Sequence, residues 1–236
     1  MIAIYKREMR SYFSSPIGYI FVALFMAVSA WFFMSYTLQQ GENSNFGTYF
    51  QMILVLFVAI LPLLTMKLMS EERKLKTEQL ILTGPVSLAG IVLSKFFAAF
   101  SVFGGSFLLS SFIYYIPLQL YGNPNTVIYF CCVLAVLLGG AAFIAMGVFV
   151  SSLTENQFIA AFGTMAMIVP FLFASSLNGY INNEIIRAVL SGISITARYS
   201  SFATGVFDWA ALLYYISLCG IYLFLTVRVL EKRRWD

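Results

Sequence analysis

Six long apolar runs, separated by shorter polar segments, constrain this chain more than any other feature. The first run, as an α-helix of about 22 residues, would extend roughly 33 Å, which is enough to cross the hydrocarbon core of a bilayer. Lipid leaves no partner for an exposed backbone group, so a run of this length is expected to be helical. We therefore predict an all-α polytopic membrane protein, one transmembrane domain over residues 1–236, with six transmembrane helices. Their predicted spans are 17–38, 49–68, 91–117, 126–150, 157–176 and 209–230.

Composition supports the membrane class and excludes several functions. Hydrophobic residues make up 61% of the chain and charged residues 10%, with a mean hydropathy of +0.87, whereas a soluble domain carries about 25% charged residues. Histidine is absent, which removes His-based zinc sites and Ser-His or Cys-His catalysis. Cys131, Cys132 and Cys219 lie in apolar runs and are interpreted as small apolar fillers. No metal or cofactor site is predicted, and no basic cluster suggests a nucleic acid partner.

The positive charges are distributed unequally between the two sides of the predicted bundle. Twelve of the 14 Lys and Arg residues fall on the side that both termini share, and only Arg187 and Arg198 fall on the other. Cytoplasmic loops carry the excess of Lys and Arg. We therefore expect both termini in the cytoplasm and the chain in the cell (inner) membrane, surrounded by lipid.

The N-terminal stretch Met1–Phe13 mixes apolar and basic residues at helical spacing. Residues 2, 5, 9 and 13 share one face, and the cations Lys6, Arg7 and Arg10 spread over another. This pattern predicts a short amphipathic helix at the cytoplasmic interface. A basic flank that only fixes the topology is an equally good interpretation.

A polar island, Ser70–Lys95, separates the second span from the third. Leu68, Leu75 and Leu82 recur at seven-residue intervals, which predicts an amphipathic helix reaching Leu82, and Thr83-Gly84-Pro85 would end it. Glu72 and Lys76 would form an i,i+4 ion pair. A solvated connector is the alternative, but Ser151–Asn156 joins two spans with far fewer residues. We therefore expect a partner outside the membrane to contact this segment, residues 69–90.

The segment 177–208, before the last span, is nearly as long as a span but is interrupted by glycine and polar residues. It predicts two short helices at the outer interface or re-entering the membrane, because irregular backbone at membrane depth needs protein or water partners.

Two motifs and this layout resemble one transporter family. EERKLKTEQLILTGPVS at 71–87, REMRSYFSSPIGY at 7–19, and six spans with a long outer segment before the last look like ABC-2 type transporter permeases. GVFD at Gly205–Asp208 is similar to the gliding-motility and nitrous-oxide-accessory branch. In that branch an Arg commonly precedes the Gly, whereas Thr204 stands here.

The resemblance implies that segment 69–90 is a coupling helix that docks on a separate ATPase subunit. The residues that would contact the ATPase, by matching position, are Glu71, Glu72, Arg73, Thr77, Glu78 and Leu80. Pro85 and Val86 would shape the return to the membrane. Met1–Phe13, with its cations Lys6, Arg7 and Arg10, would be the interface helix that cradles the ATPase.

The same resemblance implies the composition of a complex. Two ABC ATPase subunits would bind ATP and Mg²⁺, and a second permease chain would complete a homodimer or heterodimer. This chain has no Gly-x-x-x-x-Gly-Lys-Ser/Thr loop, so it is not expected to be an enzyme. Export is the direction that the resemblance favours, and the substrate stays open.

Other functions make different demands on the spans. A proton- or ion-coupled secondary transporter needs ionisable or broken-helix sites at mid-membrane, and we expect every charged side chain at a span end or in a loop. An intramembrane protease would need a Ser-Lys pair or paired Asp residues in the spans, and neither is present. A membrane scaffold without transport activity stays open.

Overall fold

The computed structural model describes residues 1–37, 46–77, 87–121, 124–181 and 183–235. This part of the chain is almost entirely helical and contains no strand. The helices are α1 (Ile2–Ser14), α2 (Pro16–Tyr36), α3 (Phe46–Thr65), α4 (Lys67–Lys74), α6 (Leu88–Tyr121), α7 (Thr126–Leu153), α8 (Gln157–Phe173), the 3-10 helix η2 (Ala174–Gly179), α9 (Glu184–Ile193), α10 (Ile195–Ala203) and α11 (Trp209–Trp235).

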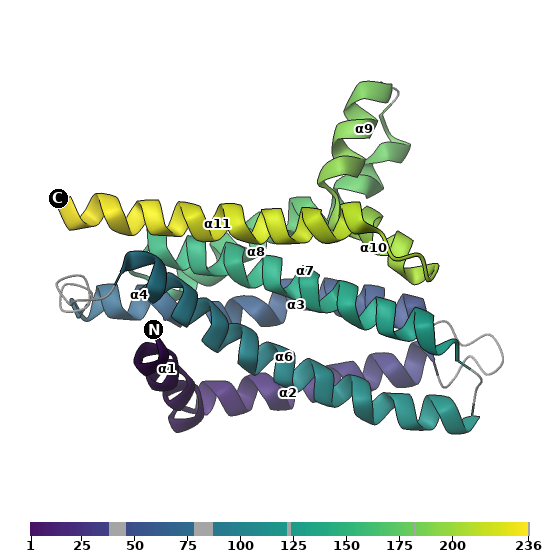
Figure 1. Ribbon diagram of the computed structural model, residues 1–236, viewed down its shortest axis with the longest axis horizontal. Helices are drawn as coiled ribbons and strands as arrows, with labels where there is room; N and C mark the ends of the chain where they lie inside the picture. Colours follow the sequence, from purple (N-terminus) through teal and green to yellow (C-terminus); the bar gives the residue numbers. More distant parts are fainter. Residues whose placement is uncertain (38–45, 78–86, 122–123, 182, 236) are drawn as a thin grey trace.

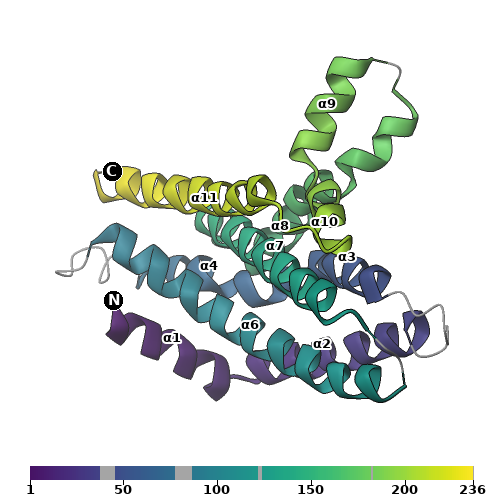
Figure 2. The same ribbon diagram turned by 45° about the vertical axis from the view of Figure 1, so that its right-hand side comes forward.

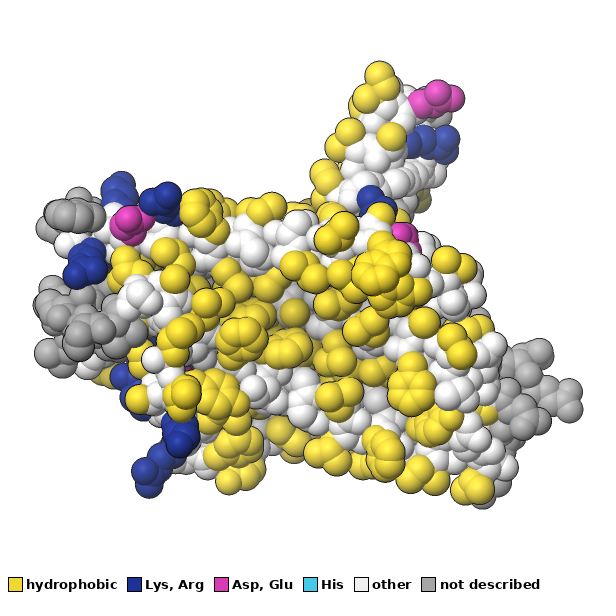
Figure 3. All heavy atoms as spheres, in the orientation of Figure 1, with side chains coloured by type: hydrophobic (Ala, Val, Ile, Leu, Met, Phe, Trp, Pro, Cys, Tyr) yellow, Lys and Arg dark blue, Asp and Glu magenta, His cyan; other side chains and the backbone are white. Residues whose placement is uncertain are grey.

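Within these described ranges, six helical stretches are long and apolar enough to cross a membrane, which confirms the predicted fold class. They are α2, α3 with α4, α6, α7, α8 with η2, and α11. They run side by side along the long axis, and both chain ends lie at one end of the bundle, called here the terminal end (Figure 1). On the face in Figure 3 the flank is largely hydrophobic, and most Lys and Arg side chains gather at the terminal end.

Several helices extend beyond their predicted spans, α6 and α11 by the most at their C-terminal ends. α6 continues past Pro117, the predicted end of its span, to Tyr121, and α11 continues past Leu230 to Trp235. A proline removes one intrahelical hydrogen bond and adds a clash. In α6 the packing against α2 and α7 outweighs that cost.

α7 lies at the centre of the bundle and contacts α3, α6, α8, α10 and α11. Its small residues permit this close packing. A Cβ on Gly140 would lie 2.3 Å from the Phe103 ring, and a Cβ on Gly147 would lie 2.2 Å from Thr65 Oγ1. The glycines of this span therefore let α6 and α3 approach closely.

The segment before α11 leaves the bundle as a hairpin. η2 and α9 pack against each other and project sideways, and α10 returns to the bundle (Figures 1 and 2). No residue of α9 is buried. The short helices predicted before the sixth span are thus present.

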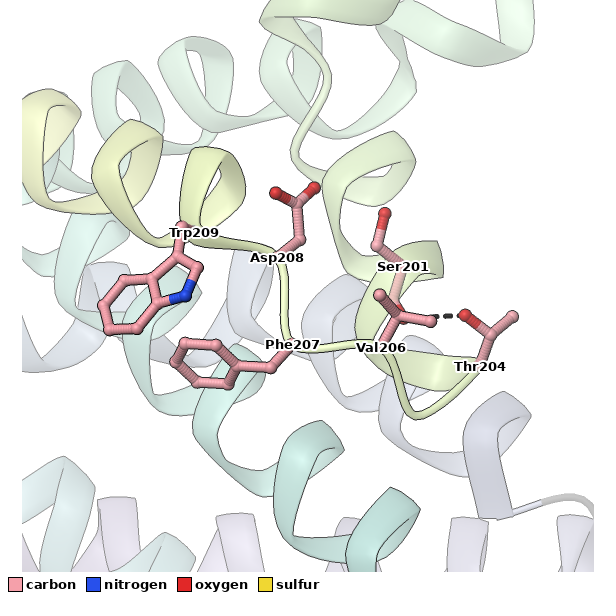
Figure 4. A pocket seen from close by; sticks show the side chains of 6 residues that line it. All are labelled: Ser201, Thr204, Val206, Phe207, Asp208 and Trp209. Atoms are coloured by element: carbon pink, nitrogen blue, oxygen red, sulfur yellow. Dashed lines mark hydrogen bonds between the residues drawn. The ribbon is translucent and has the colours of Figure 1, made fainter.

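The GVFD motif forms the corner between α10 and α11. Gly205 has φ +79°, and Gly205 N–H and Val206 N–H donate to Phe202 O (3.0 Å) and Ser201 O (3.3 Å), the Schellman arrangement that ends a helix. Asp208 Oδ1 then accepts from Ala210 N–H at 2.8 Å and caps α11. A hollow of about 450 Å³ opens at this corner, with the Phe207 and Trp209 rings on one side (Figure 4). The motif therefore has a structural explanation.

Candidate functional site, an ion-pair cluster between α1, α4 and α6

The helix predicted for the N-terminal stretch is present as α1, and it is fastened to the bundle. Tyr5 Oη donates to Ser101 Oγ at 2.9 Å, and Tyr12 Oη donates to Leu64 O at 2.9 Å. The buried face is centred on Tyr12, whereas Ile2 and Phe13, assigned to the apolar face, are exposed. A tyrosine can bury its ring and still satisfy its hydroxyl with a hydrogen bond. The spacing of apolar residues alone therefore did not identify the buried face of α1.

Lys95 is the centre of a charge cluster at the terminal end. Its side chain is 1% exposed, and Nζ lies 3.2 Å from Glu8 Oε1 and 2.9 Å from Glu72 Oε2. Nζ also donates to Leu68 O. Lys95 sits seven residues inside α6, in the part of this span nearest the terminal end, and its side chain is buried. A charge this deeply buried requires such partners, since an unpaired one costs several kcal/mol.

Arg7 closes the cluster on its exposed side. Its Nη2 lies 2.8 Å from Glu8 Oε1 and also pairs with Glu72. Partial burial acts to lower the pKa of Arg7, but the two carboxylates outweigh it and raise the pKa above its usual value. Burial, and next the Glu8 charge, raise the pKa of Tyr12 well above its usual value. Two acids and two cations therefore join α1, α4 and α6.

α4 is also held against α7. Ser151 Oγ accepts from Met69 N–H at 3.1 Å and from Ser70 N–H at 3.2 Å. Arg73 Nη1 donates to Leu153 O at 2.9 Å, and Arg73 Nε lies 2.9 Å from Glu155 Oε1. A displacement of α4 would therefore act on α6 through Lys95 and on α7 through these contacts.

The predicted helix over Ser70–Leu82 ends early, at Lys74. Lys76 has φ +57°, and Lys76 N–H and Thr77 N–H donate to Arg73 O (3.1 Å) and Glu72 O (3.0 Å), so the helix closes in a Schellman motif. Lysine is an unusual residue for this left-handed position, so the end of the helix at this point is not marked by a glycine or asparagine. The predicted Glu72–Lys76 pair is also wrong, because Glu72 turns inward to Lys95 and Arg7.

A cavity of about 320 Å³ lies between α1 and α4, lined by the cluster and by Tyr12, Lys67, Glu71 and Thr77. Glu71 is half-exposed and lies 3.6 Å from Lys67. Lys6 and Arg10 point outward, and neither has an ion-pair partner in the described ranges. The remaining predicted contact residues, Glu78 and Leu80, lie outside the described residues, and so do Pro85 and Val86, which were predicted to shape the return to the membrane.

Sequence reasoning missed Glu8, Lys95 and Ser151. Glu8 was hidden among cations, although its spacing from Tyr5 and Tyr12 puts all three near one helical face. Lys95 gave a usable signal, because an ionisable residue inside an apolar run needs a named partner. Ser151 gave none, since a serine at a span end is ordinary.

The fold and this cluster define a multi-pass helical membrane protein whose two short helices at the terminal end are ionically connected to a span. The family model for ABC-2 type transporters matches residues 1–183. The chain therefore belongs to the ABC-2 type transporter family, as a transmembrane permease subunit. Such permeases work in general with an ABC ATPase partner and are not themselves catalytic. No curated protein matches the chain significantly.

Proposed function

We propose that this permease couples ATP hydrolysis by a separate ATPase subunit to the movement of a substrate, in the export direction. The complex would contain two ATPase subunits and a second permease chain, identical or related. ATP and Mg²⁺ would be bound by the ATPase, and this chain would hold no cofactor. The single observation that carries the proposal is the Lys95 cluster, which connects the two short helices at the terminal end to a membrane-spanning helix.

The geometry divides the proposed coupling residues into two roles. Glu71 and Thr77 lie on the accessible side of α4 and its end, and they are proposed to touch the ATPase together with Glu78 and Leu80. Glu72 pairs with Lys95 and Arg73 pairs with Glu155 within this chain. These two residues would therefore transmit the motion of the ATPase to the spans. Pro85 and Val86 keep their proposed role in the return to the membrane.

The cations of α1 divide in the same way. Lys6 and Arg10 are exposed and unpaired in the described part of the chain, which suits contact with an acidic ATPase surface or with lipid headgroups. Arg7 belongs to the ion-pair cluster. Cytoplasmic termini and the inner membrane follow from the charge distribution and remain part of the proposal.

A secondary transporter is the main alternative, and Lys95 is the residue that could favour it. Lys95 lies seven residues after Leu88, about 10 Å along a helix of 34 residues, so it is far from mid-span. Both of its carboxylate partners are within 3.2 Å. This arrangement suits a structural ion pair, and the coupling proposal is preferred. The gliding-motility and nitrous-oxide-accessory branch stays a prediction, because GVFD also serves as a helix cap.

Co-purification from the native host tests the proposal. The full chain in mild detergent is expected to bring an ATPase at about one copy per permease. Glu71→Lys should weaken that association, because Glu71 is half-exposed and makes no ion pair with Lys95 or Arg7, so its reversal leaves the buried cluster intact. Glu184→Lys, an exposed acid on the opposite hairpin, is the matched control. A wild-type chain that arrives alone and without ATP hydrolysis would favour the secondary transporter or a scaffold.

A further inference from the structure

Arg198 stands apart from the other cations of the chain. It lies on α10, toward the end of the bundle opposite the termini, with its guanidinium carbon 5.6 Å from the centre of the Tyr214 ring. Tyr214 is itself fixed, because its hydroxyl donates to Ile193 O. Arginine stacks on aromatic rings through cation–π attraction, so the guanidinium is held against a rigid surface.

No anion of the described chain neutralises Arg198. The acidic residues of segment 177–208 are Glu184 and Asp208, and neither is within 4.0 Å of its nitrogens, while Asp208 caps α11. Nε is buried without a hydrogen-bond acceptor. The two terminal nitrogens of Arg198, Nη1 and Nη2, are not buried as Nε is. Neither of them donates a hydrogen bond to a described residue. They are therefore accessible donors that lack an acceptor.

The depth of Arg198 along α11 indicates which anion would be available. Tyr214 lies five residues after Trp209, so the guanidinium is roughly 8 Å from the helix end. Each headgroup layer of a bilayer is about 5–8 Å thick outside the hydrocarbon core. Arginine side chains near the end of a span extend into this interfacial layer, where charged headgroups are the available partners. Phosphates of amphiphiles occupy the same level.

We propose that Arg198, supported by Tyr214, binds the phosphate of a phosphate-bearing amphiphile. The two terminal guanidinium nitrogens would donate to two phosphate oxygens, which is the bidentate geometry that arginine favours. The amphiphile is either a bilayer phospholipid or a molecule that carries the same group through the permease. The inference is independent of the ATPase coupling proposed above.

Native mass spectrometry of the purified full chain tests this site with dioctanoyl phosphatidylglycerol as the probe. Arg198→Gln is expected to weaken binding at least tenfold, and Arg198→Lys to a smaller extent, because lysine keeps the charge and loses the fork. Arg187→Gln is the matched control, since Arg187 is an exposed cation of the adjacent hairpin, and its Nε donates to Asn178 O at 2.9 Å. Arg187→Gln should bind like the wild type.

Competition against the phosphatidylglycerol probe identifies the chemical group that the site binds and the kind of molecule that carries it. Dioctanoylglycerol, which lacks the phosphate, should neither bind at this site nor displace the probe. Displacement by millimolar inorganic phosphate would support a soluble phosphate ligand, and displacement only by acylated phosphates would support an amphiphile. Equal binding by the wild type and a folded Arg198→Gln chain would overturn the proposal. An equal loss of probe binding in Arg187→Gln would overturn it as well. If Arg198→Gln fails to fold, Arg198→Lys takes its place, and binding equal to that of the wild type would overturn the proposal.

Discussion

The Lys95 cluster makes a quantitative prediction about stability. Glu8→Gln with Glu72→Gln would leave Lys95, 1% exposed, without a carboxylate. Removing the partners of a buried charge costs about 3–5 kcal/mol. Lys95→Met is expected to cost less, about 1–3 kcal/mol, because the two acids are 13% and 17% exposed and keep Arg7 as a partner.

The triple variant Lys95→Met/Glu8→Gln/Glu72→Gln separates this explanation from simple loss of contacts. Replacing all members of a buried ion pair by neutral groups is often nearly neutral. The triple variant should therefore be within about 1 kcal/mol of the wild type, so that Lys95→Met rescues the double acid variant. This is strong non-additivity of the kind that a mutant cycle measures.

Unfolding by sodium dodecyl sulfate in mixed micelles, followed by circular dichroism, would measure these free energies. The exposed pair Lys67–Glu71 provides the control, because its side chains are 25% and 41% exposed and such pairs contribute about 0.3–0.5 kcal/mol. A triple variant destabilised by the sum of its parts, or a double acid variant as stable as the control, would refute the buried-pair reasoning.

Three further predictions use the same unfolding assay. Gly205→Ala should cost about 1–2 kcal/mol, because φ is +79° and the new Cβ would lie 2.8 Å from Ile128 Cγ1; an unchanged midpoint would contradict this turn. Lys76→Gly should stabilise the chain by up to about 1 kcal/mol, because glycine adopts the left-handed conformation without strain, and a loss of stability would argue against the Schellman ending of α4. Gly147→Ala should cost about 1–3 kcal/mol by overpacking, and Thr65→Ala should relieve part of that cost, so additive losses would count against the α3–α7 contact.

The long apolar runs of the sequence predicted the fold well. Apolar runs of sufficient length require helices in lipid. The corrected features depend on single side chains. Leu75 and Leu82 suggested a continuous helix, but the backbone at Lys76 turns into a conformation that favours glycine.

The candidate site was only partly predictable for a related reason. The coupling segment and the N-terminal helix were found from charge and periodicity, yet their connection was not. The ion pairs Arg7–Glu72 and Glu8–Lys95 join positions 65 and 87 residues apart, and only Glu72 and Lys95 are closer in the sequence. No local pattern encodes which of several acids and cations will meet, because that depends on how α1 packs on α6.

The central claim is that the Lys95 cluster transmits motion between the ATPase and the spans. The most direct measurement compares ATP hydrolysis by the co-purified complex in nanodiscs for the wild type and the triple variant, which is expected to be folded and to retain the ATPase. We predict that the triple variant loses most of the stimulation that the permease gives to ATP hydrolysis. Full stimulation in a folded triple variant that still binds the ATPase would contradict the role of the cluster.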